Sequence, residues 1–562
     1  MKPIFSDTRF LEQKAKRLFH FPEYIMMENA AAAMEKEVLS ALEEIDGIKE
    51  RTCENCRGTK SSNEKRAPLV VILCGSGNNG GDGYALSRRL FGKCSVLVLS
   101  FGGTKTDEAK RQAEMARSCG VHIIEAESAA SCNGEEAFNL ARVFVDCLYG
   151  SGFHGELNEK TAAFLEKINS IDAKKIACDI SSGIDSFGRI LSKDSRGERL
   201  AFKADKTIVM GALKTALFSD EAKDFTGRIE VAELGIARNV FENCADSALF
   251  DSAPSNQCSQ SENAKPAMQS CSNDFVCSSE CKAFPDAYLL EKTDITLPER
   301  NKHNVHKGQF GHCAVVIGEK AGAAIIAGTA ALKSGAGLVT CVHFCRPHTF
   351  LMTPELMEDA SFPEKTSAVL LGCGLGRTNT AAFNPTLDFI FGMKNPACVF
   401  DADFFYYDNI GDVLEKLCKT ENARVILTPH PKELFALAKN CGIKDITEKI
   451  ALEMRFEAAK KIAALFPRIV LIAKGANTLI AHGNKLFVSE FGSPALSKAG
   501  SGDVLAGFCA GLLAQGFNAL EAAKTAVYLQ GSASRLFENR WELSPLDLTR
   551  LSTAEDSLLF HL

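Results

Sequence analysis

With 562 residues, the chain is longer than one hydrophobic core usually organises, so we expect two or more domains. Hydrophobic residues make up 46% of it, charged residues 24%, and the formal net charge is −6 at pH 7, a balance typical of soluble globular proteins. This composition lacks the basic excess that nucleic-acid binding requires. No apolar stretch reaches the roughly 18 residues that span a bilayer, so we expect no nucleic-acid and no membrane partner.

The start of the chain and its cysteines predict a cytoplasmic location. Residues 1–7 lack the apolar core of a secretion signal. The chain contains 21 cysteines, and several of them, such as Cys74, Cys147 and Cys178, lie inside apolar runs. A thiol in such a place behaves as a small hydrophobic side chain, which indicates a reducing compartment.

The first part of the chain alternates apolar, β-rich runs with helical segments. The predicted strands are 69–74, 94–99, 143–147, 175–179 and 207–210. This alternation is typical of a Rossmann-like, doubly wound α/β domain. A polar stretch at 49–66 interrupts the pattern and is interpreted as a surface insertion.

A glycine-rich segment follows the first of these strands. Residues 75–83 read GSGNNGGDG, which formally contains the GxGxxG pattern of dinucleotide-binding folds. A dehydrogenase would need an acidic residue at the end of the next strand, but that strand ends in Leu99-Ser100-Phe101. The amides and carboxylate of the segment instead suit a phosphate and a cation. A purely structural turn is the alternative interpretation.

Acidic residues follow two further predicted strands. Asp146 and Asp179 each stand at a strand end, and Ser182 follows the second of them closely. Because ligands bind at the carboxyl edge of open α/β sheets, we expect these three residues and Asn79 to converge on one pocket. Each aspartate taken alone is more often a cap or loop residue.

Residues 239–287 are rich in Ser, Asn, Gln and Cys and lack hydrophobic periodicity. They predict a linker between an N-terminal domain, 1–238, and a C-terminal domain, 288–562. The strand and helix alternation resumes after the linker with different motifs. The predicted strands there are 313–317, 368–371, 397–400, 424–427 and 469–473. A second α/β domain is therefore expected.

A glycine turn leads directly into an apolar helix near the end of the chain, in the sequence Gly500-Ser501-Gly502-Asp503. Free amides at a helix N-terminus attract anions, and an aspartate beside them can accept a proton from an attacking hydroxyl. This arrangement predicts phosphoryl transfer with Asp503 as the catalytic base. An ordinary connection with a capping aspartate is the alternative.

Residues 10–236 resemble the N-terminal epimerase domain of the bifunctional NAD(P)H-hydrate repair enzymes. The resemblance rests on Met27-Glu28-Asn29-Ala30, the NNGGDG segment, Asp146 with its glycine turn, and the DxxSGxD segment that begins at Asp179. It implies epimerisation at C6 of hydrated NADH and NADPH, with Asp179 as the catalytic residue. It also implies a potassium ion bound by Asn79, Asp146 and Ser182. The substrate-binding residues that it implies are Asn78, Asn79, Gly80, Gly81, Asp82, Gly150, Gly152 and Asp179.

The family usually has proline at the position of Ser181, a departure that leaves Asp179 and Ser182 in place. The second acid of the epimerisation stays open. Lys105, in the loop after the second predicted strand, is one candidate, and an exposed surface lysine is the preferred interpretation of it.

The C-terminal domain resembles the ADP- or ATP-dependent NAD(P)H-hydrate dehydratases, which have a ribokinase-like fold. The matching motifs, in chain order, are Gly322-Ala323-Ala324, Gly372-Cys373-Gly374-Leu375-Gly376, Thr428-Pro429-His430-Pro431, Lys474-Gly475-Ala476 and the GSGD turn. Cys373 replaces a proline that is usual in the family. The resemblance implies that the nucleotide phosphorylates the C6 hydroxyl of the S hydrate, so that NAD(P)H forms with release of phosphate and of AMP or ADP.

The resemblance also assigns binding residues in this domain. The hydrate would contact Ala323, Gly374, Gly376, His430 and Asp503. ADP or ATP, with Mg²⁺, would bind at Lys474, Gly475, Ala476, Asn477, Thr478, Gly500, Ser501 and Gly502. His430 has an alternative interpretation as a loop cap. Both nucleotides stay open as donors, since their phosphates would lie against the same amides.

Two other functions are compatible with these patterns. The glycine turn and Asp503 would also serve a kinase of a small alcohol, and the N-terminal domain would then be a nucleotide- or protein-binding module. The acidic residues at its strand ends favour the epimerase. We expect the chain to form a homo-oligomer.

Overall fold

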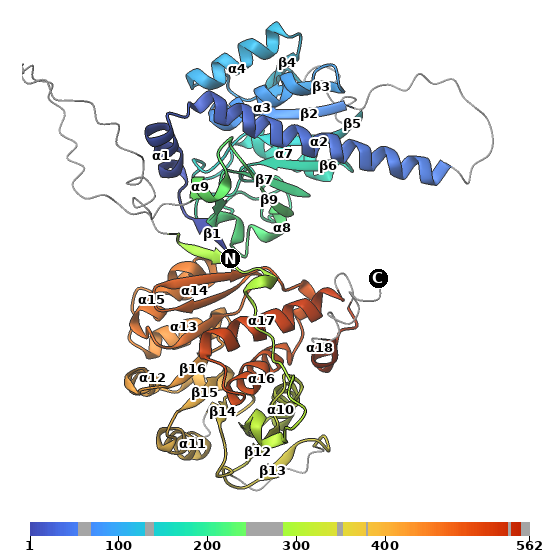
Figure 1. The fold of residues 1–562 in the computed structure, drawn as a ribbon. Helices are drawn as coiled ribbons and strands as arrows, with labels where there is room; N and C mark the ends of the chain where they lie inside the picture. The colour runs from blue at the N-terminus through green and yellow to red at the C-terminus, as the bar shows by residue number, and fades with distance from the viewer. Residues whose placement is uncertain are drawn as a thin grey trace, which may run out of the picture.

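The structure, a computed structural model, describes residues 1–53, 69–129, 140–242, 285–344, 352–377, 380–537 and 541–551. It contains two α/β units that lie one above the other in Figure 1, the N-terminal unit above. Most of the predicted insertion at 49–66 and of the predicted linker at 239–287 lies outside the described residues. Among the helices that are described, none combines the length and the apolar character needed to cross a membrane.

The N-terminal unit is built on a seven-stranded parallel sheet with the order β4-β3-β2-β5-β6-β7-β9. Its strands are β2 (Leu69–Cys74), β3 (Ser95–Ser100), β4 (His122–Glu125), β5 (Ala141–Cys147), β6 (Lys174–Cys178), β7 (Lys206–Met210) and β9 (Arg228–Ala232). The strand order reverses between β2 and β5, which is where open α/β sheets bind their ligands. The predicted doubly wound α/β fold is confirmed.

Helices cover both faces of this sheet and enclose two apolar cores. Buried side chains of α2, α3 and α4 pack on one face, and those of α7 pack on the other. The helices are α1 (Arg9–Phe19), α2 (Glu23–Cys53), α3 (Asn78–Leu90), α4 (Asp107–Ser118), α5 (Ala126–Ala129), α7 (Glu159–Ser170), α8 (Lys223–Thr226) and α9 (Arg238–Glu242), with the 3-10 helix η1 (Thr215–Phe218).

The second sheet has twelve strands in the order β13-β12-β11-β14-β15-β16-β17-β18-β19-β10-β1-β8. Its parallel part runs from β13 to β17, and β18 and β19 extend it in antiparallel pairing. The strands of the C-terminal unit are β10 (Ala287–Leu289), β11 (His312–Val316), β12 (Leu338–Val342), β13 (Met357–Asp359), β14 (Ala368–Leu371), β15 (Ala397–Phe400), β16 (Arg424–Leu427), β17 (Val470–Ala473), β18 (Thr478–His482) and β19 (Lys485–Ser489).

Helices also cover both faces of this sheet. One face packs against α10, α16 and α17, and the other against α11, α12, α13 and α15. The helices are α10 (Ala321–Lys333), α11 (Thr380–Gly392), α12 (Ile410–Lys419), α13 (Pro431–Asn440), α14 (Glu448–Glu453), α15 (Arg455–Leu465), α16 (Ser501–Ala514), α17 (Ala519–Arg535) and α18 (Pro545–Leu551). The 3-10 helices are η3 (Lys292–Asp294), η4 (Lys307–Phe310), η5 (Ala402–Tyr406) and η6 (Pro494–Leu496).

The two units share one sheet edge. Strand β1 (Lys2–Phe5) pairs antiparallel with β10, and β8 (Leu213–Lys214) pairs parallel with β1, so both belong to the second sheet. The sequence had placed these residues in the domain 1–238 and had placed Ala287 in the linker. The side chain of Ile4 is fully buried in an apolar cluster that also contains residues of the C-terminal unit. The units are therefore joined by a continuous core.

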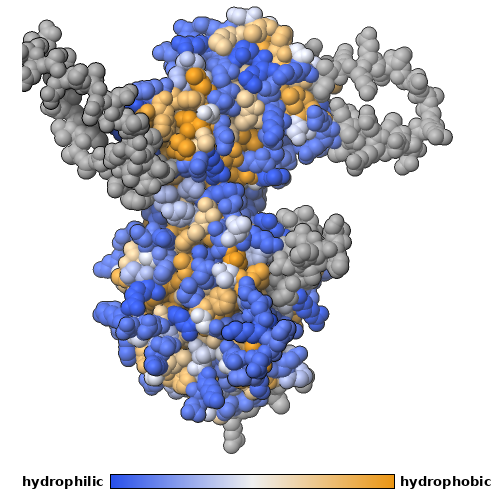
Figure 2. Space-filling view, viewed as in Figure 1, coloured by the Kyte–Doolittle hydropathy of each residue, from blue (hydrophilic) through white to orange (hydrophobic). Residues whose placement is uncertain are grey.

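Most of the molecular face shown in Figure 2 is hydrophilic, with smaller hydrophobic areas on both units. This distribution agrees with the composition of the whole chain, in which 24% of the residues are charged.

Candidate active sites

A cavity of about 690 Å³ lies at the carboxyl edge of the first sheet, where the strand order reverses. Six of the predicted substrate-binding residues line it: Asn78, Asn79, Asp82, Gly150, Gly152 and Asp179. Of the four residues predicted to converge on one pocket, Asn79 and Asp179 line this cavity, whereas Asp146 and Ser182 are not among its lining residues. The volume is in the range of small-molecule sites.

The NNGGDG segment is the first part of a helix rather than a loop. Helix α3 begins at Asn78, directly after Gly77, and so includes the whole segment. A Cβ atom at Gly80 would lie 1.9 Å from the carbonyl oxygen of Gly75, and one at Gly81 would lie 2.6 Å from the methyl carbon of Met27. These two predicted substrate-binding residues are buried. Their glycines let the helix approach its neighbours closely.

Asp179 is held in an unusual conformation at the end of β6. Its φ angle is 70°, in the left-handed region that non-glycine residues rarely adopt. One carboxylate oxygen accepts hydrogen bonds from the ammonium group of Lys214 and, at 3.2 Å, from the amide of Met210. The other oxygen lies beside Gly150, where a Cβ atom would approach it to 3.2 Å. Such strain is often found at functional sites.

Two further carboxyl groups in this cavity are protonated more readily than usual. Burial, followed by the charge of Asp179, raises the pKa of Asp82 well above its ordinary value. Burial also raises the pKa of Glu12, although Lys214 acts in the opposite direction. The cavity thus holds an aspartate that is paired with a lysine, beside two carboxyl groups whose pKa values burial raises.

Asp146, at the end of β5, is fully buried. Its carboxylate accepts hydrogen bonds from the amide of Ser182 at 2.7 Å, the hydroxyl of Ser182 at 2.7 Å, and the amide of Leu148 at 3.1 Å. Burial raises the pKa of Asp146 to about 6, although these bonds oppose the shift. The side-chain amide of Asn79 donates to the carbonyl of Tyr149 at 3.0 Å, and the amide of Tyr149 donates to Ser182.

Sequence reasoning missed Lys214 and Glu12. The only signal for Lys214 was a charged residue inside the apolar run 212–218, and Glu12 lies on the separate helix α1. Lys105 is exposed and is not among the residues that line the cavity. The exposure of its side chain agrees with the preferred interpretation of Lys105 as a surface lysine.

The second candidate site lies at the start of α16. Gly500 precedes the helix with a φ of 91°, and the first intrahelical hydrogen bond is donated by Val504 to its carbonyl. The amides of Gly502 and Asp503 therefore have no acceptor within the helix, whereas that of Ser501 donates to the carbonyl of Lys498 at 3.2 Å. Asp503 is in this turn. Burial, assisted by the charge of Asp401, raises the pKa of Asp503 to about 6.

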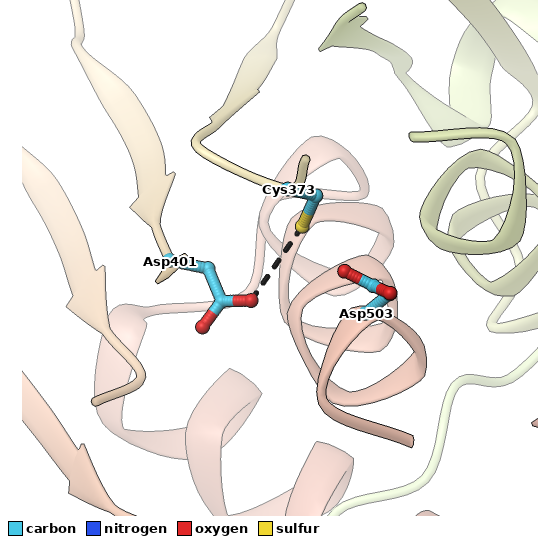
Figure 3. Close-up of side chains that lie close together, drawn as sticks. All are labelled: Cys373, Asp401 and Asp503. Carbon is cyan, nitrogen blue, oxygen red and sulfur yellow. Dashed lines mark hydrogen bonds between the residues drawn. The ribbon is translucent and has the colours of Figure 1, made fainter. Parts of the chain in front are cut away.

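Three side chains from different elements meet at this point (Figure 3). Ligand atoms of Cys373, Asp401 and Asp503 lie within 4.8 Å of one another, and the thiol of Cys373 donates to Asp401 at 3.6 Å. Lys474 is 2.9 Å from Asp401 and 3.7 Å from Glu433. Burial opposes the charge of Lys474, but these two acids outweigh it and raise its pKa.

The cysteine that replaces the usual proline is fully buried. Burial and the charge of Asp401 raise the pKa of Cys373 well above its ordinary value, so the thiol stays neutral. It acts here as a hydrogen-bond donor to Asp401. A thiol is a poor ligand for Mg²⁺, and Lys474 already neutralises Asp401, so this cluster does not fit a magnesium ion.

The predicted hydrate-contacting residues approach this region from several loops. A Cβ atom at Gly374 would lie 2.9 Å from that of Ala323, and the amide of Gly376 donates to Asp403 at 2.9 Å. His430 caps α13: its Nδ1 accepts from the amide of Lys432 at 3.1 Å. This cap was the alternative interpretation of His430. Its side chain is 45% exposed, so a ligand contact is also compatible with the geometry.

The predicted nucleotide-binding segment Lys474–Thr478 connects β17 to β18. The side chain of Asn477 is 1% exposed and donates at 3.0 Å to the carbonyl of Phe218, in the N-terminal unit. The amide of Ala476 donates at 2.8 Å to Asp220, which is also in that unit. Of this segment, Lys474 points towards Asp401 and the GSGD turn, where a Cβ atom at Gly502 would lie 3.3 Å from its ammonium nitrogen.

Comparison with known proteins gives a consistent result for both units. Residues 313–555 match the family described as NAD(P)H-hydrate dehydratase, and residues 23–216 match the family described as YjeF-related protein N-terminus. The bifunctional NAD(P)H-hydrate repair enzyme Nnr of Helicobacter pylori is 37% identical over 551 residues, which cover 98% of each chain. The enzyme of the same name from Escherichia coli is 26% identical over 84% of this chain and 81% of its own.

A solved structure of the ADP/ATP-dependent NAD(P)H-hydrate dehydratase from Bacillus subtilis, co-crystallised with ATP and Mg²⁺, is 26% identical. The match covers 46% of this chain and 92% of that one, with a TM-score of 0.37. The identity and coverage of the Helicobacter relative show that the chain belongs to the family of bifunctional NAD(P)H-hydrate repair enzymes. The family resemblance inferred from the sequence motifs is confirmed.

Proposed function

We propose that the chain repairs hydrated NADH and NADPH with two activities, epimerisation of the R and S hydrates at C6 and nucleotide-driven dehydration of the S hydrate. The observation that carries this proposal is the presence of two aspartate-centred sites in a chain that matches a repair enzyme along 98% of its length. We place the enzyme in the cytoplasm, where the free thiols of the described cysteines would stay reduced.

In the C-terminal unit, Asp503 accepts the proton of the C6 hydroxyl as this oxygen attacks the terminal phosphorus of ADP or ATP. The amides at the start of α16 stabilise the charge on the transferring phosphoryl group. Phosphate then leaves C6 with its electron pair, a proton leaves the ring, and NAD(P)H forms with AMP or ADP. Hydroxide is a much poorer leaving group, which is why the nucleotide is needed.

Lys474 supports this site by holding Asp401 in an ion pair, which partly offsets the negative charge that Asp401 adds beside Asp503. Mg²⁺ would supply charge neutralisation on the nucleotide phosphates. Because Cys373, Asp401 and Asp503 do not fit this ion, we derive no step from a magnesium ligand on the protein.

In the N-terminal unit, Asp179 is the base and Asp82 the acid. Lys214 donates a hydrogen bond to Asp179, and burial raises the pKa of Asp82 well above its ordinary value. Asp82 can deliver a proton to the C6 oxygen as the C6–O bond breaks and water leaves, and Asp179 can take a proton from the water that adds to the opposite face of C6. We therefore propose Asp82 rather than Lys105 as the second acid.

Potassium fits the chemistry of Asp146, Ser182 and Asn79, which offer carboxylate, hydroxyl and amide oxygens. Asp146 is fully buried, and no salt bridge to it is found in the described part of the chain. A monovalent cation would neutralise this charge and fix the turn that carries Gly150 beside Asp179.

The function is tested by mixing the chain with hydrated NADH, Mg²⁺ and either ADP or ATP and following absorbance at 340 nm. We expect NADH to form with one of the nucleotides and not without it. Chromatography of the remaining hydrates reports epimerisation. A phosphorylated hydrate that accumulates without NADH would contradict the proposal and favour a kinase.

A further inference from the structure

A short segment of the N-terminal unit reaches into the C-terminal unit at the loop between β17 and β18. It includes η1 and the residues that follow it, Ser219 to Lys223. The carbonyl of Phe218 accepts from the Asn477 side chain at 3.0 Å, and Lys223 donates to the other end of the same side chain. Asp220 accepts from the amides of Ala476 at 2.8 Å and Asn477 at 3.4 Å. The loop's own backbone is thus held by the other unit.

Asp220 also neutralises Arg455, which is only 4% exposed. Both carboxylate oxygens of Asp220 accept hydrogen bonds from the guanidinium group. The same guanidinium donates at 3.0 Å to the carbonyl of Ala473 and at 2.8 Å to that of Asn477, on either side of the loop. A Cβ atom at Gly475 would lie 2.3 Å from its central carbon. The guanidinium group of Arg455 therefore packs beneath the loop and binds its backbone carbonyls, and Asp220 holds this group in place through two hydrogen bonds.

This loop begins at Lys474, whose ammonium group lies next to Asp401 and the first turn of α16. Any shift of the loop backbone moves that charge relative to the phosphate-binding amides. Arg455 is buried, so removal of Asp220 would leave an uncompensated charge beneath the loop. The contacts from 218–223 are therefore placed to preorganise a ligand site in the C-terminal unit.

We infer that Asp220 of the N-terminal unit is a positioning residue for the nucleotide subsite of the dehydratase. The inference rests on the proposed function, which assigns that subsite to Lys474 and its loop. Asp220 acts through Arg455 and the amides of Ala476 and Asn477 and does not touch the nucleotide. It lines a cavity of about 360 Å³ between the units, which adjoins the epimerase cavity at Ser151 and Gly152, but Asp220 itself is not among the residues of the epimerase cavity.

The test compares Asp220→Asn with the full-length wild-type chain. We expect the Kd for ADP or ATP with Mg²⁺, measured by calorimetry without hydrate, to rise about 10-fold, because an amide cannot neutralise Arg455 or accept from the loop as strongly. The KM for the nucleotide should rise by the same factor, while kcat and the epimerisation rate change less than twofold. Asp224→Asn is the matched control, since Asp224 is an exposed acid four residues away.

If Asp220→Asn does not fold, the double variant Asp220→Ala with Arg455→Met tests the inference instead, because it removes both charges together. We expect the double variant to fold and to bind the nucleotide as weakly as we expect of Asp220→Asn. A nucleotide Kd within twofold of wild type in either folded variant would overturn the inference, as would parallel losses of both activities with a lower Tm.

The inference and the proposed function fail in different ways. A wild-type chain that binds ADP or ATP but forms no NADH contradicts the function, and the binding comparison still decides the role of Asp220. If the wild-type chain forms NADH and Asp220→Asn binds the nucleotide with unchanged affinity, only the inference is contradicted. Absence of nucleotide binding in the wild type would overturn both.

Discussion

The chemistry of the C-terminal unit depends on the ionisation of Asp503. Burial and Asp401 raise its pKa to about 6, and only the ionised carboxylate can accept the hydroxyl proton. We therefore expect kcat for dehydration to fall tenfold per pH unit below pH 6 and to level off above it. The rate of NADH formation between pH 5 and pH 8 tests this expectation. A flat profile through pH 6 would contradict it.

Asp503→Asn removes this base while keeping the shape of the side chain. We expect dehydration to fall about 100-fold or more and epimerisation to be unchanged. Because the folded state raises the pKa of Asp503 from 3.8 to about 6, the free energy of unfolding falls as pH rises through that interval and stays at the lower value above it. The variant should thus be at least as stable as wild type at pH 8. Near-normal turnover at 340 nm would remove Asp503 from the mechanism.

Asp179 is the corresponding residue of the epimerase. Asp179→Ala should abolish conversion of R to S hydrate and leave dehydration of pure S hydrate intact, because the base is lost from one cavity only. Lys105→Ala is the matched control and should epimerise within twofold of wild type, since Lys105 is exposed. Replacing potassium with lithium should slow only epimerisation. Chromatography of the two hydrates measures all three effects.

At the scale of elements, the close approach of α3 to its sheet is what positions Asn78, Asn79 and Asp82. Gly80→Ala would place a methyl group 1.9 Å from the Gly75 carbonyl oxygen, whereas a Cβ atom at Gly77 meets nothing within 4 Å. We expect Gly80→Ala to lower the free energy of unfolding by about 1–3 kcal/mol and to impair epimerisation. Gly77→Ala should change stability by less than 1 kcal/mol. Denaturant titration of both variants distinguishes them, and equal effects would contradict this account of the helix.

Long apolar runs were predictable from the sequence because they are buried on both faces. The predicted strands 69–74, 368–371, 397–400 and 424–427 have the observed boundaries. The start of α3 was not predictable, because three glycines within its first six residues disfavour a helix in isolation. Packing against Gly75 and Met27 outweighs that propensity. The side chains at strand ends could be placed from topology, but the partner Lys214 could not.

At the scale of the whole molecule, the contacts that join the two units could hardly be predicted from the sequence. Strands β1, β8 and β10 are two to four residues long, and their pairing joins positions 2–5 with 213–214 and 287–289. The ion pair between Asp220 and Arg455 spans 235 residues. Such contacts follow from how two folded units dock, and no local pattern in a single sequence reports them.

The contacts between the two units allow a prediction about cleavage of the chain between residues 243 and 284, which the structure does not describe. If β1 and Asp220 hold the units together, cleavage at a protease site inserted there should leave the two fragments in one complex with both activities. The physical reason is the burial of Ile4 in the shared core and the buried partner of Asp220, since separation would expose both. Size-exclusion chromatography at micromolar concentration, beside a denaturing gel, measures the outcome.

Ile4→Asp in the cleaved protein should release the fragments, because a carboxylate cannot be buried there without a partner. Separate elution of the fragments without that substitution would mean that the linker alone joins the units.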